Sequence, residues 1–379
     1  MRSLAPLALA GLVLAPAGSG CRSLAPLAEN APPSPPIPGA TLVDHLIRPE
    51  ERHFAHLWRV TSGGENAEAY WSFDGDRLVL QRSDPSAGVE CDRIYVTSES
   101  GGALELVSSG RGKTTCAYFL PDGRSVLYAT TEAVHEACPP PPDRSRGYVW
   151  PIHPEFDVVV AELATGRTRP LVSGPGYDAE ATISPRGDTM VFTSTRSGDL
   201  ELWVATLEGE RPVQVTDRLG YDGGAFFSHD GSRLVFRSTE FPGGEAGEAA
   251  RERYRELLRD GLVAPTAMEI WTVSTDGSGL ERVTRLGGAN WAPSFFPDDR
   301  RIVFSSNHHD DRRPALDFEL WAVDLDGSNL ERITFFDEGP GRQFDAFPLF
   351  SPDGRWLAFS SNRGAEEPGE TNVFVAQWQ

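Results

Sequence analysis

Short runs of β-forming, largely apolar residues recur along the chain, each a few residues after a tight-turn motif. The motifs are variants of Ser-Pro-Asp-Gly and occupy residues 72–75, 120–123, 184–187, 228–231, 296–299 and 351–354. The runs that follow them occupy residues 78–81, 126–129, 190–193, 234–237, 302–304 and 356–359. A Gly-containing turn between two apolar runs is typical of a β-hairpin. Each motif therefore predicts a pair of antiparallel strands.

Each hairpin is followed by further strand-like runs that complete a repeating unit. Third strands are expected at residues 94–96, 157–161, 200–205, 269–273, 318–323 and 372–376. A fourth strand is clearest at residues 280–284 and 330–334, which read LERVT and LERIT. Six units of four antiparallel strands are the content of a six-bladed β-propeller, an all-β fold. We therefore predict one propeller domain over residues 41–379.

Both ends of the repeat array are incomplete in complementary ways. Residues 56–61, HLWRVT, match the fourth strands but precede the first turn motif, whereas the last unit stops after its third strand. An N-terminal strand that completes the sixth blade would close the ring and remove an open sheet edge. We therefore expect the N-terminal strand to close the propeller.

Residues 1–20 have the pattern of a signal peptide. Arg2 precedes an apolar run that is too short to span a bilayer, and small residues lead into Cys21. This arrangement resembles a bacterial lipoprotein signal, in which the cysteine becomes the lipidated N-terminus. Residues 21–40 are rich in proline and predict an extended linker. We expect an exported envelope protein, lipid-anchored at the outer membrane and facing the periplasm; the alternative is a soluble periplasmic or secreted protein.

Charge and cysteine content restrict the partners. The formal net charge is −20, which argues against nucleic acid, because phosphate binding needs a basic face. It favours cations or basic segments instead. No zinc-site spacing connects Cys91, Cys116 and Cys138, so we expect either one disulfide, whose pairing the spacing leaves open, or buried thiols. We expect a monomer that meets a membrane only through its lipid.

The repeated turns followed by apolar, Trp-rich strands resemble the Pro-Asp-Gly, WD40-like propeller repeats of the TolB-like family. Similar repeats occur in the noncatalytic propellers of prolyl oligopeptidase relatives. The resemblance covers residues 42–379, and Phe73, His229 and Asp299 depart from the motif. It implies a six-bladed propeller in the bacterial envelope, which usually serves as a binding scaffold.

The chain contains none of the common catalytic or nucleotide-binding motifs. G-x-S-x-G, H-E-x-x-H, the P-loop and a dinucleotide-binding glycine motif are all absent from the sequence. We therefore expect a non-catalytic protein that binds an envelope protein, a peptide or a small ligand. Two alternatives stay open: a metal-dependent hydrolase or lyase that acts at an acidic channel mouth, and a purely structural envelope scaffold.

The repeat alignment brings polar residues to one position of every unit, six residues before the turn motif. These strand-start residues are Asn66, Thr114, Asp178, Asp222, Asn290 and Asp345. In a closed propeller they are expected around one mouth of the channel, with Glu68 and Glu180 two residues further on. We predict a ligand site formed by Asn66, Glu68, Asp178, Glu180, Asp222, Asn290 and Asp345. The carboxylates of Asp178, Asp222 and Asp345 are candidate ligands for Ca²⁺, or for an ammonium or guanidinium group. The alternative is that these side chains cap backbone groups between blades.

Every long insertion joins the second and third strands of a unit, which places it on the same face as the strand starts. The insertions occupy residues 82–90, 130–156, 238–268, 305–317 and 360–371. The fourth unit's insertion predicts a helix that Gly261 ends, with an apolar stripe of Ala250, Tyr254, Leu257 and Leu258. This helix either packs on the rim or serves as a lid or docking element. The second unit's insertion is Pro-rich and aromatic and is suited to wall a pocket.

The lipoprotein interpretation predicts the outcome of one substitution. Cys21→Ser removes the acceptor thiol, so we expect loss of lipid attachment with an unchanged propeller. Mass spectrometry of the mature N-terminus and membrane fractionation measure this. Wild-type protein that is found in the periplasm without a lipid contradicts the prediction.

Overall fold

A computed structural model describes residues 34–309, 317–336 and 343–379. The predicted signal peptide, Cys21 and most of the predicted linker lie outside the described residues. Residues Pro35–Gln379 form one compact unit, and all the described strands belong to it. None of the helices in the described residues has both the length and the apolar composition of a membrane span.

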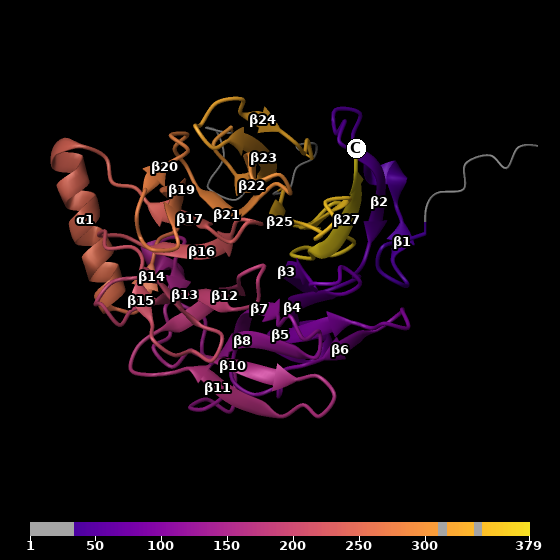
Figure 1. Ribbon diagram of the computed structural model, residues 1–379, viewed down its shortest axis with the longest axis horizontal. Coiled ribbons are helices and arrows are strands. Elements are labelled where there is room, and N and C mark those ends of the chain that lie inside the picture. Colours follow the sequence, from indigo (N-terminus) through magenta and orange to yellow (C-terminus); the bar gives the residue numbers. More distant parts are fainter. Residues whose placement is uncertain (1–33, 310–316, 337–342) are drawn as a thin grey trace, which may run out of the picture. The chain divides into compact units, whose positions relative to one another are not determined.

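Six antiparallel sheets follow one another along this unit, and each is one blade of a propeller. Figure 1 shows the innermost strands of the blades gathered toward the centre. These strands are β3 (Glu65–Trp71), β7 (Thr114–Phe119), β12 (Asp178–Ile183), β16 (Asp222–Phe227), β21 (Asn290–Phe295) and β25 (Asp345–Phe350), which begin blades 1 to 6 in that order. The predicted all-β, six-bladed propeller is confirmed.

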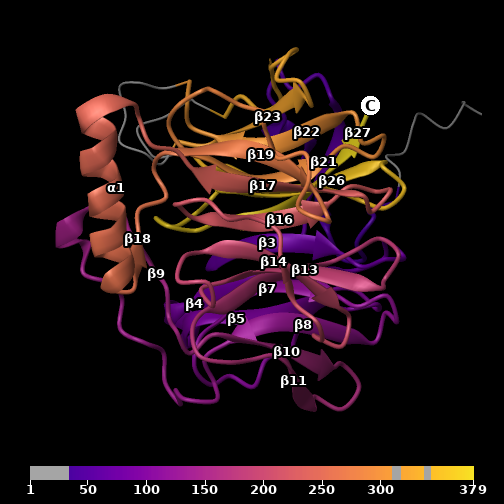
Figure 2. The same ribbon diagram turned by 60° about the vertical axis from the view of Figure 1, so that its left-hand side comes forward.

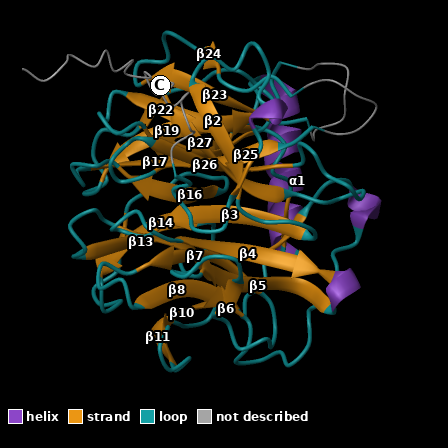
Figure 3. Ribbon diagram, turned by 90° about the vertical axis from the view of Figure 1, so that its right-hand side faces the viewer, coloured by secondary structure: helices purple, strands orange, loops and turns teal. Residues whose placement is uncertain are grey.

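The remaining strands of each blade lie progressively outward, and strands form nearly all of the regular structure in Figure 3. The second strands are β4 (Leu78–Asp84), β8 (Ser125–Thr130), β13 (Thr189–Ser194), β17 (Arg233–Thr239), β22 (Arg301–Ser306) and β26 (Trp356–Ser361). The third strands are β5 (Val89–Thr97), β10 (Asp157–Glu162), β14 (Glu201–Thr206), β19 (Met268–Ser274), β23 (Glu319–Asp324) and β27 (Asn372–Trp378). The fourth strands of blades 1 to 5 are β6 (Leu104–Leu106), β11 (Thr168–Val172), β15 (Val213–Gln214), β20 (Glu281–Arg282) and β24 (Glu331–Arg332).

Residues of the hydrophobic core recur at one position of the sequence repeat. The position eight residues after the start of each turn motif lies in the second strand and holds a large side chain that is 0% exposed in every blade. The residues are Leu80, Tyr128, Phe192, Phe236, Phe304 and Phe359. Each contributes about 1.5–3 kcal/mol by burial of its apolar surface against the adjoining blades. The apolar runs that predicted the second strands are therefore also the core.

Blade 6 takes its outer strands from the N-terminal part of the unit. β2 (Phe54–Arg59) pairs with β27, and β1 (Thr41–Leu42) pairs with β2. Leu57 and Trp58 of β2 are 0% and 1% exposed. The predicted closure of the ring by the N-terminal strand is confirmed.

A buried ion network lies at the same junction. The Arg363 guanidinium, 0% exposed, donates to both Glu51 carboxylate oxygens at 2.9 and 3.1 Å and to Asp345 Oδ2 at 2.7 Å. Glu51 belongs to the segment before β2, whereas the other two residues belong to blade 6. Loss of one partner would leave a buried charge uncompensated, so the network fixes the closing segment in one position.

Two insertions add structure outside the blades. β9 (Trp150–Pro151) of the blade-2 insertion pairs antiparallel with β18 (Leu262–Val263) of the blade-4 insertion. Figure 2 shows α1 (Gly244–Arg259) beside these two strands. Tyr254 and Leu257 of α1 are buried, so the predicted helix packs on the rim. Short 3-10 turns occur at η1 (Asp44–Leu46), η2 (Pro85–Ala87) and η3 (Arg144–Arg146).

Closure by β2 predicts the effect of its removal. Deletion of residues 53–61 exposes the edge of β27, and we expect aggregation or unfolding because an unpaired strand edge is a template for association. Deletion of Thr41 and Leu42 is the matched control, since it removes β1, whose two residues are exposed, and leaves β2 on β27. Sedimentation and thermal melting distinguish the two variants. A soluble 53–61 deletion that melts like the wild type contradicts the closure argument.

Candidate functional site

Every innermost strand carries a β-bulge at the same repeat position. In β3, for example, Ala67 pairs with Gln81 and Tyr70 pairs with Val79, so two residues of β3 oppose one residue of β4. The same register shift occurs in the other five innermost strands. Each bulge holds one residue with a left-handed backbone: Glu68 (φ 53°), Cys116 (52°), Glu180 (57°), Gly224 (61°), Ala292 (45°) and Phe347 (58°). Non-glycine residues in this region cost about 1–2 kcal/mol each, and such strained positions cluster at functional sites.

These bulge residues together line one cavity of about 250 Å³, the channel cavity. A bulge turns its residue out of the normal strand alternation, which is why the same repeat position faces the cavity from all six blades. Aromatic side chains, among them Tyr177, Tyr221 and Trp291, form much of the wall. A concave, mostly apolar cavity with a few polar groups is the usual form of a ligand site.

The roof of the channel cavity comes from the blade-2 insertion. Trp150 and Ile152 line the cavity, and the Trp150 ring lies 5.0 Å from the Trp291 ring. The pairing of β9 with β18 holds this segment, and the Ile152 amide donates to the Gly261 carbonyl at 2.7 Å. The aromatic insertion thus walls a pocket, as its composition predicted.

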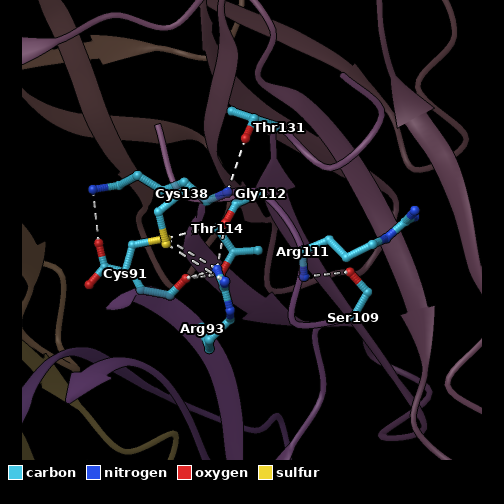
Figure 4. The surroundings of a disulfide bond; sticks show 10 residues. Cys91, Arg93, Ser109, Arg111, Gly112, Thr114, Thr131 and Cys138 are labelled. Atoms are coloured by element: carbon cyan, nitrogen blue, oxygen red, sulfur yellow. Dashed lines mark hydrogen bonds and ion pairs between the residues drawn. A yellow bond between two sulfur atoms is a disulfide. The ribbon is translucent and has the colours of Figure 1, made fainter. Parts of the chain in front are cut away.

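A disulfide fastens the same insertion at a second point. Cys91 on β5 is bonded to Cys138 in the loop that leads to the roof, and Arg93 lies beside the bond (Figure 4). The Arg93 guanidinium donates to the Gly112 carbonyl at 2.6 Å. Cys116 is free of a disulfide, so of the three cysteines in the described residues the structure pairs Cys91 with Cys138, a choice that the sequence left open.

Tyr70 and Phe226 line the floor of the channel cavity, and the Tyr118 ring packs against both. Tyr70, Tyr118 and Phe226 come from blades 1, 2 and 4, and their ring centroids lie 5.1 to 6.2 Å apart. Phe226 lines the channel cavity on one side and a second cavity of about 260 Å³, toward the turn motifs, on the other. These three rings, the aromatic plug, lie between the channel cavity and the second cavity.

Glu180 is held by a dense set of donors. Its Oε1 accepts a hydrogen bond from the Tyr221 hydroxyl at 2.6 Å, and Arg237 forms an ion pair with it. Its Oε2 accepts from the Thr193 hydroxyl at 2.8 Å and from the Gly224 amide at 2.9 Å. Burial by itself would raise the pKa of Glu180, but Arg237 and the hydrogen bonds outweigh burial and lower it.

Glu68 has the opposite environment. Its Oε2 is buried and accepts no hydrogen bond. Burial raises the pKa of Glu68 to about 7, although a hydrogen bond from the Cys116 thiol acts in the other direction. Burial and the charges of Glu68 and Glu180 also raise the pKa of Cys116, so its thiol stays protonated.

The structure places the strand-start residues between blades. All six are at most 2% exposed, and none lines the channel cavity. Asn66 Nδ2 donates to the Gly63 and Thr371 carbonyls at 2.9 and 2.8 Å, and Thr114 Oγ1 donates to the Asp92 carbonyl at 2.8 Å. Of the predicted ligand residues, only Glu68 and Glu180 are therefore brought together at the cavity. The reason is the bulge, which redirects the position two residues further along.

The three candidate metal ligands have different surroundings. Asp178 pairs with Arg196 at 2.8 Å, and Asp345 pairs with Arg363. Asp222 is 0% exposed, and neither of its carboxylate oxygens accepts a hydrogen bond. Within the described ranges, no three His, Cys, Asp or Glu side chains are grouped as a metal site. The Ca²⁺ hypothesis stays a prediction.

Sequence reasoning missed Arg237, although a signal for it was present. The position nine residues after the start of each turn motif holds small or uncharged residues in the other blades: Gln81, Ala129, Thr193, Ser305 and Ser360. A single arginine at this position of the alignment stands out. A similar comparison would have found Arg196 and Arg363, which both follow their aspartates by 18 residues.

The comparisons with known proteins agree with this architecture. No family model matches the chain. The uncharacterized protein Atu1656 of Agrobacterium fabrum is 28% identical over 176 residues, which are 46% of this chain and 52% of that protein. A TolB homolog of Chlorobium luteolum is 29% identical over 140 residues, which are 32% of either chain. The chain thus covers about half of the first relative and about a third of the second.

A solved structure of a TolB-type protein from Agrobacterium tumefaciens superimposes with a TM-score of 0.52. It is 20% identical to this chain and covers 83% of it, and the chain covers 91% of that protein. Blades, closure and cavity define a six-bladed β-propeller. Within that class, the chain is similar to TolB-type propellers. At this identity the structural likeness establishes the fold alone.

The unpaired Asp222 predicts a pH-dependent stability. Burial raises its pKa from 3.8 to about 7, and burial followed by the Asp222 charge raises that of Glu201 from 4.5 to about 8. Because the folded-state values lie above the unfolded ones, the pair contributes stability below about pH 4 and loses it as pH rises through 7 to 8. Asp222→Asn should therefore raise the free energy of unfolding at pH 8.5 by about 1–3 kcal/mol and flatten its pH dependence.

Asparagine fits this position because Asn290 occupies it in blade 5. There its Nδ2 donates to the Met268 carbonyl at 2.8 Å and to Glu269 at 3.3 Å. Asp178→Asn is the matched control, which should destabilise by about 1–2 kcal/mol because it breaks the ion pair with Arg196. Urea unfolding at pH 5.5 and 8.5 measures both. A destabilised Asp222→Asn at pH 8.5 contradicts the assignment.

Proposed function

We propose that this chain is a non-catalytic envelope propeller that binds a ligand or a protein partner in the channel cavity. The observation that carries the proposal is the cavity itself, which residues from all six blades line and an inserted roof covers. The cavity lies between the roof and the aromatic plug, so a ligand reaches it from the face that bears the insertions. Loops on one face of a rigid scaffold are where binding usually resides.

The state of three polar groups of the cavity, Glu180, Cys116 and Arg237, supports binding over catalysis. Glu180 is fully hydrogen-bonded, and its lowered pKa makes it a weak general base. The Cys116 thiol has a raised pKa, whereas a nucleophilic cysteine needs a lowered one. Nη2 of the Arg237 guanidinium is held by Glu180 and the Tyr221 hydroxyl. These groups shape and polarise the wall of the cavity.

The envelope location is part of the proposal. The Cys91–Cys138 disulfide fits an oxidising compartment, as does the signal sequence that residues 1–20 predict. We infer that lipidation of Cys21 anchors the propeller at the outer membrane and that residues after it act as a spacer. The end of the predicted linker lies on the propeller, since Ile37 is buried against blade 1.

Ala292→Phe tests the cavity without a change of charge. The next bulge already carries Phe347 with a similar backbone, so phenylalanine is compatible with this position and fills the cavity. Purified wild type and variant are immobilised and exposed to envelope extract, and retained species are identified by mass spectrometry. We expect the species that the wild type retains to be lost from the variant.

His229→Ala is the control for this experiment. His229 lines the second cavity beyond the aromatic plug, so its removal should leave retention unchanged. Equal melting temperatures establish that both variants are folded. Retention of the same species by wild type and Ala292→Phe would show that the channel cavity is not the binding site.

A further inference from the structure

Glu68 is the unpaired charge of the channel cavity. Two acid–base pairs also line it: Glu180 with Arg237, and Asp92 with Lys113 at 3.1 Å. Each pair is neutral as a unit, so neither cation is free to attract an anionic ligand. Two buried atoms of the lining residues, Glu68 Oε2 and Arg237 Nε, have no hydrogen-bond partner; Arg237 is already paired with Glu180, whereas Glu68 has no ion-pair partner among the described residues.

The surroundings of Glu68 explain why it tolerates this position. The Cys116 thiol faces it from β7, Glu180 from β12, Asp92 from β5 and Arg237 from β17. Burial and the charges of Glu180 and Asp92 raise the pKa of Glu68, and together they outweigh Cys116 and Arg237, which lower it. With a pKa of about 7, the empty cavity holds the carboxyl about half protonated at neutral pH. A ligand that brings a positive charge would favour the carboxylate form and supply the missing donor.

The cavity wall suits an organic cation better than a metal ion. Tyr177, Tyr221, Trp150 and Trp291 line the same space, and the faces of aromatic rings attract ammonium and guanidinium groups. A hard metal ion would need several oxygen ligands in place of rings. Arg237 already shows this preference, because its guanidinium carbon lies 4.7 Å from the Tyr221 ring centroid and 5.4 Å from that of Trp150.

We propose that the channel cavity binds the ammonium or guanidinium head of a basic ligand, with Glu68 as its counterion and the aromatic wall around it. This inference rests on the proposed function, because it names the ligand class of the same cavity. A volume of about 250 Å³ admits one side-chain-sized group and no folded segment. The formal net charge of −20 would draw such a ligand to the protein.

The test uses a charged probe and its uncharged isostere. Acetyl-arginine amide and acetyl-citrulline amide have nearly the same shape, but only the first is a cation. Calorimetry at pH 8.5 should show at least about tenfold tighter binding of the arginine probe to the wild type. Glu68→Gln should lose that preference. Glu105→Gln is the matched control, since Glu105 is exposed on the outermost strand of the same blade and the variant has the same net charge.

The pH dependence gives an independent readout. Ionised Glu68 binds the cation, so affinity for the arginine probe should fall about 30-fold between pH 8.5 and 5.5 as the carboxyl is protonated. Binding by Glu68→Gln should be weak at both values. A wild type that binds equally well at both pH values would overturn the role of Glu68.

The source of the cation is distinguished by a third probe. Agmatine carries the guanidinium head without peptide groups, so tighter binding of acetyl-arginine amide assigns a peptide ligand and tighter binding of agmatine assigns a free amine. Both outcomes support the cation site.

Failure of this inference and failure of the proposed function give different results. If no probe binds the wild type, or if both isosteres bind alike, the cation inference is wrong, and the loss of envelope capture in Ala292→Phe still supports the cavity as a binding site. If Ala292→Phe keeps both envelope capture and probe binding, the channel cavity is not the binding site, and both proposals are wrong.

Discussion

Pairing of β2 with β27 is the contact on which the rest of the structure depends. Each blade packs mainly on its two neighbours, so without this pairing the blades would form an open array with exposed edges. The channel cavity needs a bulge residue from all six blades at one place, and only a closed ring provides that. The buried contact of Glu51 with Arg363 adds an electrostatic constraint to the same junction, because it ties the closing segment to blade 6.

The features that depend on local pattern were predictable, and the bulges were not. Turn motifs and apolar runs specify hairpins, and their regular recurrence specifies the number of blades. The bulge residues include an acid, a thiol, a glycine, an alanine and a phenylalanine, so they share no chemistry that an alignment would detect. Their common property is a left-handed backbone, and only Gly224 belongs to the residue type that signals it. The register between neighbouring strands decides where the extra residue lies, and that register is not local.

The same register separates the strand-start residues from the cavity. Repeat alignment correctly grouped them at one position, but their side chains bind backbone carbonyls and arginines between blades. Whether the strand-start residue is Asp or Asn follows from the side chain that it contacts. Asp178 and Asp345 each pair with an arginine 18 residues later, whereas Asn290 donates to Glu269 of the preceding blade. Asp222 meets Glu201 without such an arginine, so burial and like charge raise both pKa values. The strand-start position therefore holds a neutral side chain in some blades, a carboxylate paired with an arginine in others, and in blade 4 a buried carboxylate without an ion pair.

The contrast between Glu180 and Glu68 shows how one fold gives equivalent residues different roles. Both occupy the bulge, and both are acidic. Arg237 and the hydrogen bonds lower the pKa of Glu180 and favour its ionised form, so a ligand would have to displace those donors to reach it. Glu68 lacks them, and an obligatory charge there would cost several kcal/mol through loss of hydration. A pKa of about 7 avoids most of that cost while the cavity is empty, because the proton neutralises the group. A bound cation can take the place of this proton. The Glu68 carboxylate therefore stays available to a positively charged ligand, because no basic side chain of the protein is paired with it.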